Sequence, residues 1–529
     1  SVHSQTVSLI WNIADDVLRD VFVRGQYRDV ILPFVVLRRL DALLEPSKEQ
    51  VEQELAEQKC IGLTEIDEIP IKQITGLSFY NKSRWTLSRL KATATGDNDL
   101  LHDNFVEYLN GYSDNVRDVL VRFEFFNKAR KLADRDCLLA MIEKVTDPNI
   151  DLTDKPTKDP NGLPLPAVTN HDMGTIFEEL LRRFNEENNE EAGEHFTPRD
   201  VIHLLSKIVF GPVLDNLPPL IQIYDPACGS GGMLTEASQF LIEHGVDKDR
   251  IEVSGTEISS ETYAICKSDL IIKNVEPGGI YYGNTLTDNH FADRTFGYMI
   301  TNPPYGKSWK EDKKKIYHDK ELIDPRFALR LNNFLGESEI VDCCTRTSDG
   351  QLMFILEMID RMKPLDMQPQ GTRIASIHNG SALFTGDAGQ AESNIRRYLL
   401  ENDLVEAIIQ LPNNIFYNTG IATYCWILTN KKKEHQQGLV LLIDASQAFN
   451  KLRKNQGNRN CTIEAYADRI YEIYESFVGT DATPWSPIKS LQIPIDDFRY
   501  NSVTIERPLR LRALFCACLL YTSPSPRDS

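Results

Sequence analysis

The sequence lacks the cysteine spacing and the long apolar runs that mark several classes of protein. Its 10 cysteines are scattered, and no two of them form a C-x-x-C pair, which argues against a zinc ribbon or a redox pair. No apolar run approaches the roughly 18 residues of a membrane span, and no basic segment followed by an apolar one opens the chain as in a secretory signal. We therefore expect a cytoplasmic protein with reduced thiols, no metal ion and no membrane contact.

Positive charge is also scarce. The 58 lysines and arginines are outnumbered by 77 aspartates and glutamates, which gives a net charge of −19. A protein that grips DNA alone usually presents a basic surface, because phosphate contacts supply most of the sequence-independent affinity. For a DNA-binding role, either the chain must hold a local basic channel or a partner must supply much of the grip.

Two common nucleotide-binding fingerprints are incomplete. A dinucleotide loop needs G-x-G-x-x-G, but Leu234 stands where the last glycine should follow Gly229 and Gly231. A P-loop needs G-x-x-x-x-G-K-[ST], but Thr301 stands where the first glycine should precede Gly306. The sequence therefore disfavours both classes of site.

What is present falls into two regions of different pattern. Residues 1–165 have apolar side chains at helical spacing and end in a Pro-, Asp-, Asn- and Gly-rich loop over 147–166, so we expect a helical N-terminal domain and a linker. Strands and helices alternate over 166–480, which predicts a mainly parallel sheet covered by helices on both faces. The predicted strands are 220–224, 251–256, 280–282, 298–301, 373–377, 405–411, 423–428 and 439–443, and the predicted helices include 231–244, 260–272, 352–362 and 394–401.

The expected fold class is therefore α/β, with the helical domain followed by a Rossmann-like domain. At the start of one helix, Thr197 is predicted as N-cap, Pro198 in the first turn and Asp200 closing a capping box. Residues 481–508 are taken as the start of a C-terminal region. Residues 509–529 show a Cys/Leu burst and then a Ser/Pro run, so we expect a non-native or artefactual tail outside the fold.

A glycine-rich turn follows the first predicted strand of the sheet. Asp225 ends that strand, and Gly229, Gly231 and Gly232 allow positive φ and a close approach of the backbone to a ligand. Glu257 ends the next strand, where a carboxylate can accept both hydroxyls of a ribose. Such a turn can also be merely a tight crossover. Asp225 before the loop could accept a hydrogen bond from a cationic amino group, which favours S-adenosylmethionine over a dinucleotide.

A second motif, Asn302-Pro303-Pro304-Tyr305, follows the strand 298–301. The exocyclic amine of adenine is a poor nucleophile because its lone pair is conjugated. Two acceptors on its N–H bonds, the Asn302 side-chain oxygen and the Pro303 carbonyl, would free that lone pair, and Tyr305 offers a stacking face for a flipped base. The alternative is a rigid loop, but two such motifs at the strand ends of one predicted sheet favour amino-methyl transfer.

With these motifs the chain resembles the modification (methyltransferase) subunit of type I restriction–modification systems, an N6-adenine DNA methyltransferase family. The resemblance runs from about Ile10 to Pro508 and includes the segments 11–16, 27–40, 194–199, 377–389 and 411–421. It implies a cofactor site for S-adenosylmethionine in which Phe196 packs on the cofactor, Asn284 contacts its adenine, and Phe416 flanks the extruded base, although core packing is the alternative for Phe416. It implies the cofactor-binding residues Glu194, His195, Phe196, Thr197, Pro198, Arg199, Asp225, Ala227, Gly229, Ser230, Gly231, Gly232, Glu257, Asn284 and Thr285.

The resemblance also implies partners. In such systems a specificity (S) subunit reads double-stranded DNA, a second modification subunit helps to clasp the duplex, and a restriction (R) subunit completes the complex. If these partners supplied most of the affinity for DNA, the acidic charge of this chain would be explained. Family members usually continue past the equivalent of Pro508 with a helical region that docks the specificity subunit, and here the sequence departs from them. Rival functions are an amino-methyltransferase acting on RNA or protein glutamine, and a non-catalytic scaffold that kept the fold.

Overall fold

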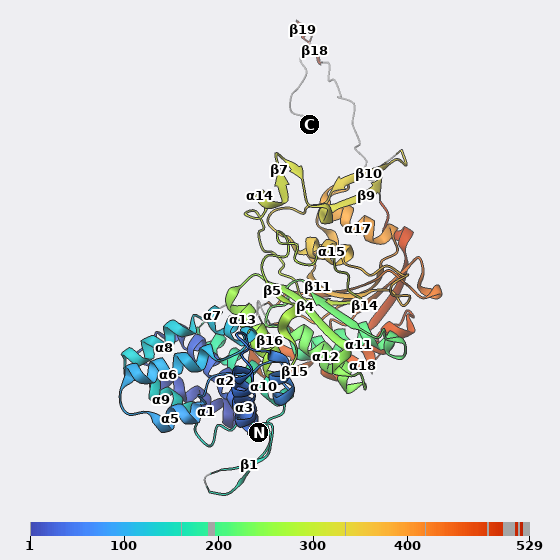
Figure 1. Ribbon diagram of the computed structural model, residues 1–529. Coiled ribbons are helices and arrows are strands. Elements are labelled where there is room, and N and C mark those ends of the chain that lie inside the picture. The colour runs from blue at the N-terminus through green and yellow to red at the C-terminus, as the bar shows by residue number, and fades with distance from the viewer. Residues whose placement is uncertain are drawn as a thin grey trace.

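The computed structural model describes two domains that pack against each other (Figure 1). The described residues are 2–159, 161–188, 196–333, 335–417, 419–483, 486–500, 514–516 and 519–521. No helix within these ranges is long and apolar enough to cross a membrane.

The N-terminal domain is a cluster of helices, as the apolar periodicity predicts. Its helices are α1 (Val2–Ile13), α2 (Arg28–Leu44), α3 (Lys48–Cys60), α4 (Glu68–Thr75), α5 (Leu87–Thr93), α6 (Asn98–Asn110), α7 (Asp114–Arg122), α8 (Phe125–Asp134) and α9 (Leu138–Val145). The predicted linker follows and contains the short hairpin of β1 (Thr157–Lys158) and β2 (Pro164–Leu165).

The second domain is built on a nine-stranded sheet with the order β17-β14-β12-β13-β11-β6-β3-β4-β5. The strands β13 and β17 run antiparallel to their neighbours, and the other pairings are parallel. The strands are β3 (Ile221–Asp225), β4 (Ile251–Glu257), β5 (Ile280–Tyr282), β6 (Tyr298–Thr301), β11 (Arg373–Asn379), β12 (Val405–Gln410), β13 (Thr423–Thr429), β14 (Leu439–Asp444) and β17 (Lys489–Pro494). The eight predicted strands are confirmed, and β17 was not predicted.

Helices cover both faces of the sheet because side chains alternate along each strand. The helices of this domain are α10 (Asn170–Asn188), α11 (Arg199–Phe210), α12 (Gly232–Glu243), α13 (Ser260–Ile272), α14 (Lys313–Ile316), α15 (Gln351–Asp360), α16 (Ser381–Phe384), α17 (Ala391–Glu401) and α18 (Ala467–Ser476). In β6, Tyr298 and Ile300 enter the core beneath α11, α12 and α18, whereas Met299 enters the core beneath α15 and α17. The four helices named from the sequence are confirmed within a few residues at each end.

Two helices join the domains. On α13, Ile265 and Ile272 belong to the core of the helical domain, while Cys266 and Leu270 belong to the core under the sheet. This two-sided burial explains why α13 has no polar face. The apolar face of α10 also packs into the helical core, although the sequence places that helix in the second region.

Short hairpins extend from the sheet domain. They are β7 (Tyr317–His318) with β8 (Glu321–Leu322), β9 (Ala328–Asn332) with β10 (Ser338–Asp342), and β15 (Asn450–Gln456) with β16 (Arg459–Thr462). In the tail, β18 (Leu514–Cys516) pairs with β19 (Leu519–Tyr521). That residues 509–529 are foreign to the fold stays a prediction.

Candidate active site

The two predicted motifs meet at the centre of the sheet's carboxyl edge. From β3 the chain moves outward through β4 and β5, then returns to β6 on the other side of β3. Parallel sheets bind ligands at such a reversal of strand order. A cavity of about 630 Å³ opens there and is lined by both the Asp225 loop and the Asn302 tetrapeptide. This volume lies within the roughly 300–1,000 Å³ of small-molecule pockets.

Glycine is required at two positions of the loop between β3 and α12. Gly229 has φ 53° and Gly231 has φ 84°, a region that other residues rarely adopt. A Cβ on Gly231 would also lie 2.7 Å from the Cys266 Sγ atom of α13. The loop is therefore pressed against the protein on one side, and its backbone lines the cavity on the other.

Asp225 is a buried carboxylate with one oxygen in use. Its Oδ1 atom accepts hydrogen bonds from the Ala227 amide at 3.0 Å and the Thr301 hydroxyl at 2.6 Å. Its Oδ2 atom has no hydrogen-bond partner among the described residues, and the side chain is 1% exposed. Burial raises the pKa of Asp225 to about 7, although its two hydrogen bonds oppose that shift. A buried, unmatched anion in a cavity is suited to a cationic ligand group.

Glu257 is held at the end of β4 by backbone donors. Its carboxylate accepts hydrogen bonds from the Gly229 amide at 3.0 Å and the Ser259 amide at 2.8 Å. The side chain therefore braces the glycine loop as well as lining the cavity. Ile258, which follows it and is 61% exposed, adds an apolar wall that the sequence analysis missed, although its position directly after Glu257 was the available signal.

Asn284 and Thr285 also reach the cavity, but their side chains are engaged within the protein. The Asn284 amide donates to Asp312 at 2.8 Å and accepts from the Leu286 amide at 3.0 Å. The Thr285 hydroxyl donates to the Pro226 carbonyl of the glycine loop. Asp312, which lines the same cavity, was not predicted from the sequence.

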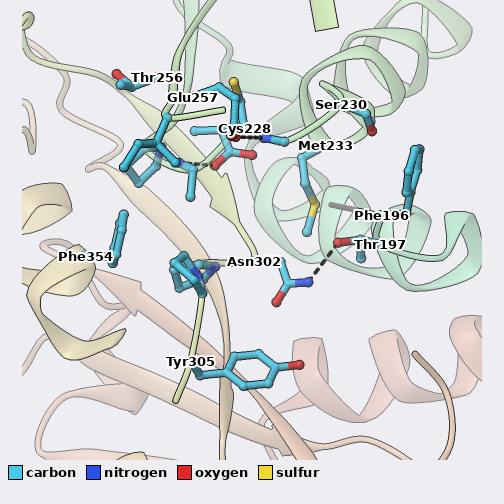
Figure 2. Close-up of a pocket in the computed structure, with 18 of the residues that line it drawn as sticks. Phe196, Thr197, Cys228, Ser230, Met233, Thr256, Glu257, Asn302, Tyr305 and Phe354 are labelled. Atoms are coloured by element: carbon cyan, nitrogen blue, oxygen red, sulfur yellow. Dashed lines mark hydrogen bonds between the residues drawn. The ribbon is translucent and has the colours of Figure 1, made fainter. Parts of the chain in front are cut away.

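Asn302 is oriented by a single hydrogen bond. Its Nδ2 atom donates to the Thr197 hydroxyl at 3.1 Å, and its Oδ1 atom is buried without a hydrogen-bond partner among the described residues. Figure 2 shows this amide between Thr197 and the ring of Tyr305. Pro303 is buried and Pro304 is exposed. The tetrapeptide thus presents an unsatisfied acceptor inside the cavity.

The predicted capping box at residues 197–200 is wrong. The N-cap of α11 is Pro198, and no side chain caps the helix. The Thr197 hydroxyl is used by Asn302 instead, and the Asp200 carboxylate accepts from Arg459 at 2.9 Å and from Thr462 at 2.6 Å. Tertiary partners therefore outcompete the local motif.

Three residues of the predicted cofactor-binding segment 194–199 lie at the cavity. Phe196, Thr197 and Arg199 line the cavity, with Arg199 also 2.8 Å from the Glu178 carboxylate of α10. Glu194 and His195 lie outside the described residues.

Aromatic side chains surround the tetrapeptide. Tyr305 is half-buried in the cavity wall, and burial raises its pKa to about 12, so it stays protonated at neutral pH. Phe416 is 1% exposed in the core under the sheet and is not among the residues that line the cavity, which favours the alternative of core packing, and a base-flanking role for it stays a prediction. The next residue, Tyr417, lines the cavity, as do Trp309 and Phe354.

His378, at the end of β11, has a structural role. It is fully buried, with its ring nitrogens bonded to Ser376 at 2.8 Å and Gln351 at 3.2 Å. Burial lowers its pKa to about 3, so it is neutral at physiological pH.

Comparisons with known proteins agree with this geometry. The family model of N-6 DNA methylases matches residues 168–502, and the model of the HsdM N-terminal domain matches residues 6–145. The chain is 26% identical over 479 residues to the type I restriction enzyme MjaIX methylase subunit of Methanocaldococcus jannaschii, covering 88% of this chain and 76% of that relative. It is 29% identical over 309 residues to the MpnII methylase subunit of Mycoplasma pneumoniae, covering 56% of this chain and only 50% of the relative.

Solved structures show the same fold. The methyltransferase subunit of a type I restriction-modification system from Streptococcus thermophilus superposes with a TM-score of 0.68 at 21% identity, covering 94% of this chain and 97% of that one. A modification subunit of a putative type I restriction enzyme from Vibrio vulnificus superposes with a TM-score of 0.57 at 15% identity, covering 95% and 93%.

Proposed function

Because the chain belongs to the N-6 DNA methylase family and is an S-adenosylmethionine-dependent methyltransferase, we propose that its cavity transfers a methyl group to the N6 atom of an adenine flipped out of duplex DNA. The observation that carries the proposal is a pair of buried acceptors, Asp225 Oδ2 and Asn302 Oδ1, on residues that line one cavity, neither of which has a hydrogen-bond partner among the described residues. The Asp225 carboxylate suits a cationic group of the cofactor, and the Asn302 oxygen suits an amine that donates a hydrogen bond.

The residues present fit the cofactor. Asp225 would accept from its ammonium group, because the carboxylate has an unused oxygen and a pKa raised by burial. Glu257 would hold the ribose hydroxyls, and the glycine loop leaves room for the ligand beside its backbone. Ala227, Ser230 and Gly232 line the same region. When bound, S-adenosylmethionine supplies a methyl group already activated on a sulfonium.

The protein's contribution to the chemistry is position and hydrogen bonding. Asn302 Oδ1 and the Pro303 carbonyl would accept the two N–H bonds of the adenine amine, which draws the nitrogen toward tetrahedral geometry and frees its lone pair. The hydrogen bond to Thr197 fixes which end of the Asn302 amide faces the cavity. No strong base is needed at the start of the step, since the amine becomes acidic only as the new bond forms.

An adenine flipped out of the duplex would need an aromatic surface on which to stack. The ring of Tyr305 forms part of the cavity wall next to Asn302, and base–aromatic stacking contributes about 1–3 kcal/mol per base. Because the sequence-based candidate Phe416 lies in the core, we infer that Tyr417, which lines the cavity together with Trp309 and Phe354, forms a second wall for the base.

The acidic charge supports action within an assembly. For a chain of net charge −19, the simplest source of DNA affinity is a set of phosphate contacts made by partner subunits. The named relatives are methylase subunits of type I restriction enzymes. We take the partners to be a specificity subunit, a second copy of this chain, double-stranded DNA and a restriction subunit, in the cytoplasm.

Labelled S-adenosylmethionine tests the proposal directly. The chain is co-expressed with the proposed specificity subunit and offered DNA, RNA and protein. Label should enter DNA as N6-methyladenine, and methylome sequencing of the host should show a motif that depends on the specificity gene. Label in RNA or protein glutamine alone would refute the DNA assignment, and a folded protein with no affinity for the cofactor would indicate a scaffold.

A further inference from the structure

The β15–β16 hairpin is a basic element on an acidic chain. Residues 450–462 contain Lys451, Arg453, Lys454 and Arg459 and no aspartate or glutamate. The side chains of Lys451, Arg453 and Lys454 are exposed, and no ion pair joins any of the three to another described residue. Nothing within the described part of the chain therefore neutralises the outer strand of this hairpin.

The inner strand of the hairpin is anchored firmly to the active-site region. Arg459, which is 8% exposed, donates to Asp200 at 2.9 Å and to the Tyr417 hydroxyl at 3.0 Å. The Asn458 amide donates to the Tyr417 carbonyl at 2.9 Å. An isolated two-stranded hairpin is marginally stable in water, so these contacts hold it in a fixed place.

That place is the rim of the cavity. Gln456 and Gly457, at the tip of the hairpin, line the same cavity as Asn302 and Tyr305. Figure 1 shows β15 and β16 beside α10, where the two domains meet. The exposed charges of β15 thus begin within a few residues of the tip that reaches the proposed base site.

A second group of exposed lysines, on α14, has acidic neighbours in sequence, unlike the β15–β16 hairpin. Lys313, Lys314 and Lys315 of α14 are exposed, but two acidic residues directly precede them and Asp319 follows. The Lys313 ammonium also lies over the Tyr317 ring at 5.1 Å. The hairpin is the better candidate because it is free of acidic residues and reaches the cavity.

We propose that the β15–β16 hairpin binds the phosphate backbone of the DNA duplex beside the target adenine, through Lys451, Arg453 and Lys454. This inference rests on the proposed DNA substrate and locates the local basic surface that an acidic chain needs. The pairing of β15 with β16 is irregular between Lys451 and Gln456, and all three basic side chains are exposed within this short stretch, so together they can reach one phosphate backbone. Phosphate contacts position a protein without reading sequence, which leaves recognition to another subunit.

The test is the salt dependence of DNA binding by the chain assembled with its specificity subunit. The triple variant Lys451→Gln, Arg453→Gln, Lys454→Gln should weaken binding uniformly across DNA sequences. It should also reduce the slope of log affinity against log salt by about 0.9 for each phosphate that is no longer neutralised, and so by up to about 2.7. The matched control is Lys248→Gln, Lys431→Gln, Lys433→Gln, which removes the same charge from exposed positions. These positions lie before β4 and after the antiparallel β13, at the amino ends of the parallel strands and away from the cavity, and the control should leave the slope unchanged.

Cofactor affinity and the thermal midpoint report folding of the triple variant, and the double variant Lys451→Arg, Lys454→Arg should keep the wild-type slope because it keeps the charge. An unchanged slope in the triple variant, or an equal reduction in the control, overturns the proposal. Dissociation of the specificity subunit from the assembly also overturns it and assigns the hairpin to protein docking. DNA binding is measured separately from methylation, so a methylation failure with an intact slope difference contradicts the proposed function alone.

Discussion

The ends of β3 and β6 carry acceptors built on a similar plan but with different charge. At the end of β3, Asp225 uses one oxygen for the Ala227 amide and the Thr301 hydroxyl, and its other oxygen has no partner among the described residues. After β6, Asn302 uses its nitrogen for Thr197, and its oxygen has no partner in the described part of the chain. In each case the protein fixes one end of a planar group and offers the other to the cavity.

The difference in charge between Asp225 and Asn302 indicates which half of the cavity suits the cofactor and which suits the base. An unmatched buried carboxylate is costly unless a cation joins it, so the β3 end suits the charged cofactor. A neutral amide can accept a hydrogen bond from an amine without fixing a charge beside it, so the β6 end suits the base. Thr301 links them, since it ends β6 and donates to Asp225.

The largest expected effect is on catalysis at the β6 end. Replacing Asn302 with alanine removes one of the two acceptors for the adenine amine, and kcat should fall by about 10²–10³-fold or more, as for removal of an oxyanion-hole donor. The Kd for S-adenosylmethionine, measured by calorimetry, should stay near the wild-type value. Methylation at the wild-type rate would refute the mechanism.

At the β3 end the expected effect is on binding. The variant Asp225→Asn keeps both hydrogen bonds to Oδ1 but removes the charge, so the Kd for the cofactor should rise about 10- to 100-fold, the effect of removing one charged hydrogen bond. The cofactor-free protein should become more stable above pH 7, by on the order of 2–4 kcal/mol, because the buried charge is gone. Urea unfolding at pH 8 measures this gain. A destabilised variant would show that the Asp225 charge is matched within the protein.

The pH dependence of binding sharpens the same contrast. Burial raises the pKa of Asp225 to about 7 in the cofactor-free protein, and a bound cation would lower it. The complex therefore holds fewer protons than the free protein, so affinity rises with pH up to about 7 and falls below it. Between pH 7.5 and 6, Kd should increase about five- to tenfold, and the Asp225→Asn variant should lose this dependence. A flat profile for the wild type would mean that Asp225 does not meet the cation.

Sequence patterns could predict the fold because strand and helix signals follow burial. The run Tyr298–Thr301 is apolar because both faces of a central parallel strand are covered, and β6 spans those residues. The unpredicted β17 has mostly exposed or half-buried side chains at the sheet edge, so it carries no such signal. Likewise, Asp225 and Asn302 were found because one ends a strand and the other directly follows one, while Tyr417 and Gln456 reach the cavity from distant segments.

Local motifs were the least reliable signal where a tertiary contact competed. Thr197 fits an N-cap by sequence, but a proline at the next position can itself begin a helix, which leaves the threonine hydroxyl available to Asn302. The sequence could not reveal this contact, because the two residues are 105 positions apart.

The smallest expected effect tests that contact. The variant Thr197→Val keeps the shape of the side chain but removes the acceptor for the Asn302 amide, so the amide loses its fixed orientation. One neutral hydrogen bond contributes about 1 kcal/mol, and kcat should fall about fivefold with the cofactor Kd nearly unchanged. Thr197→Ser, which restores the hydroxyl, should recover most of the rate. Equal decreases in both variants would mean that packing, not this hydrogen bond, positions Asn302, and the two strand ends would then no longer share one plan.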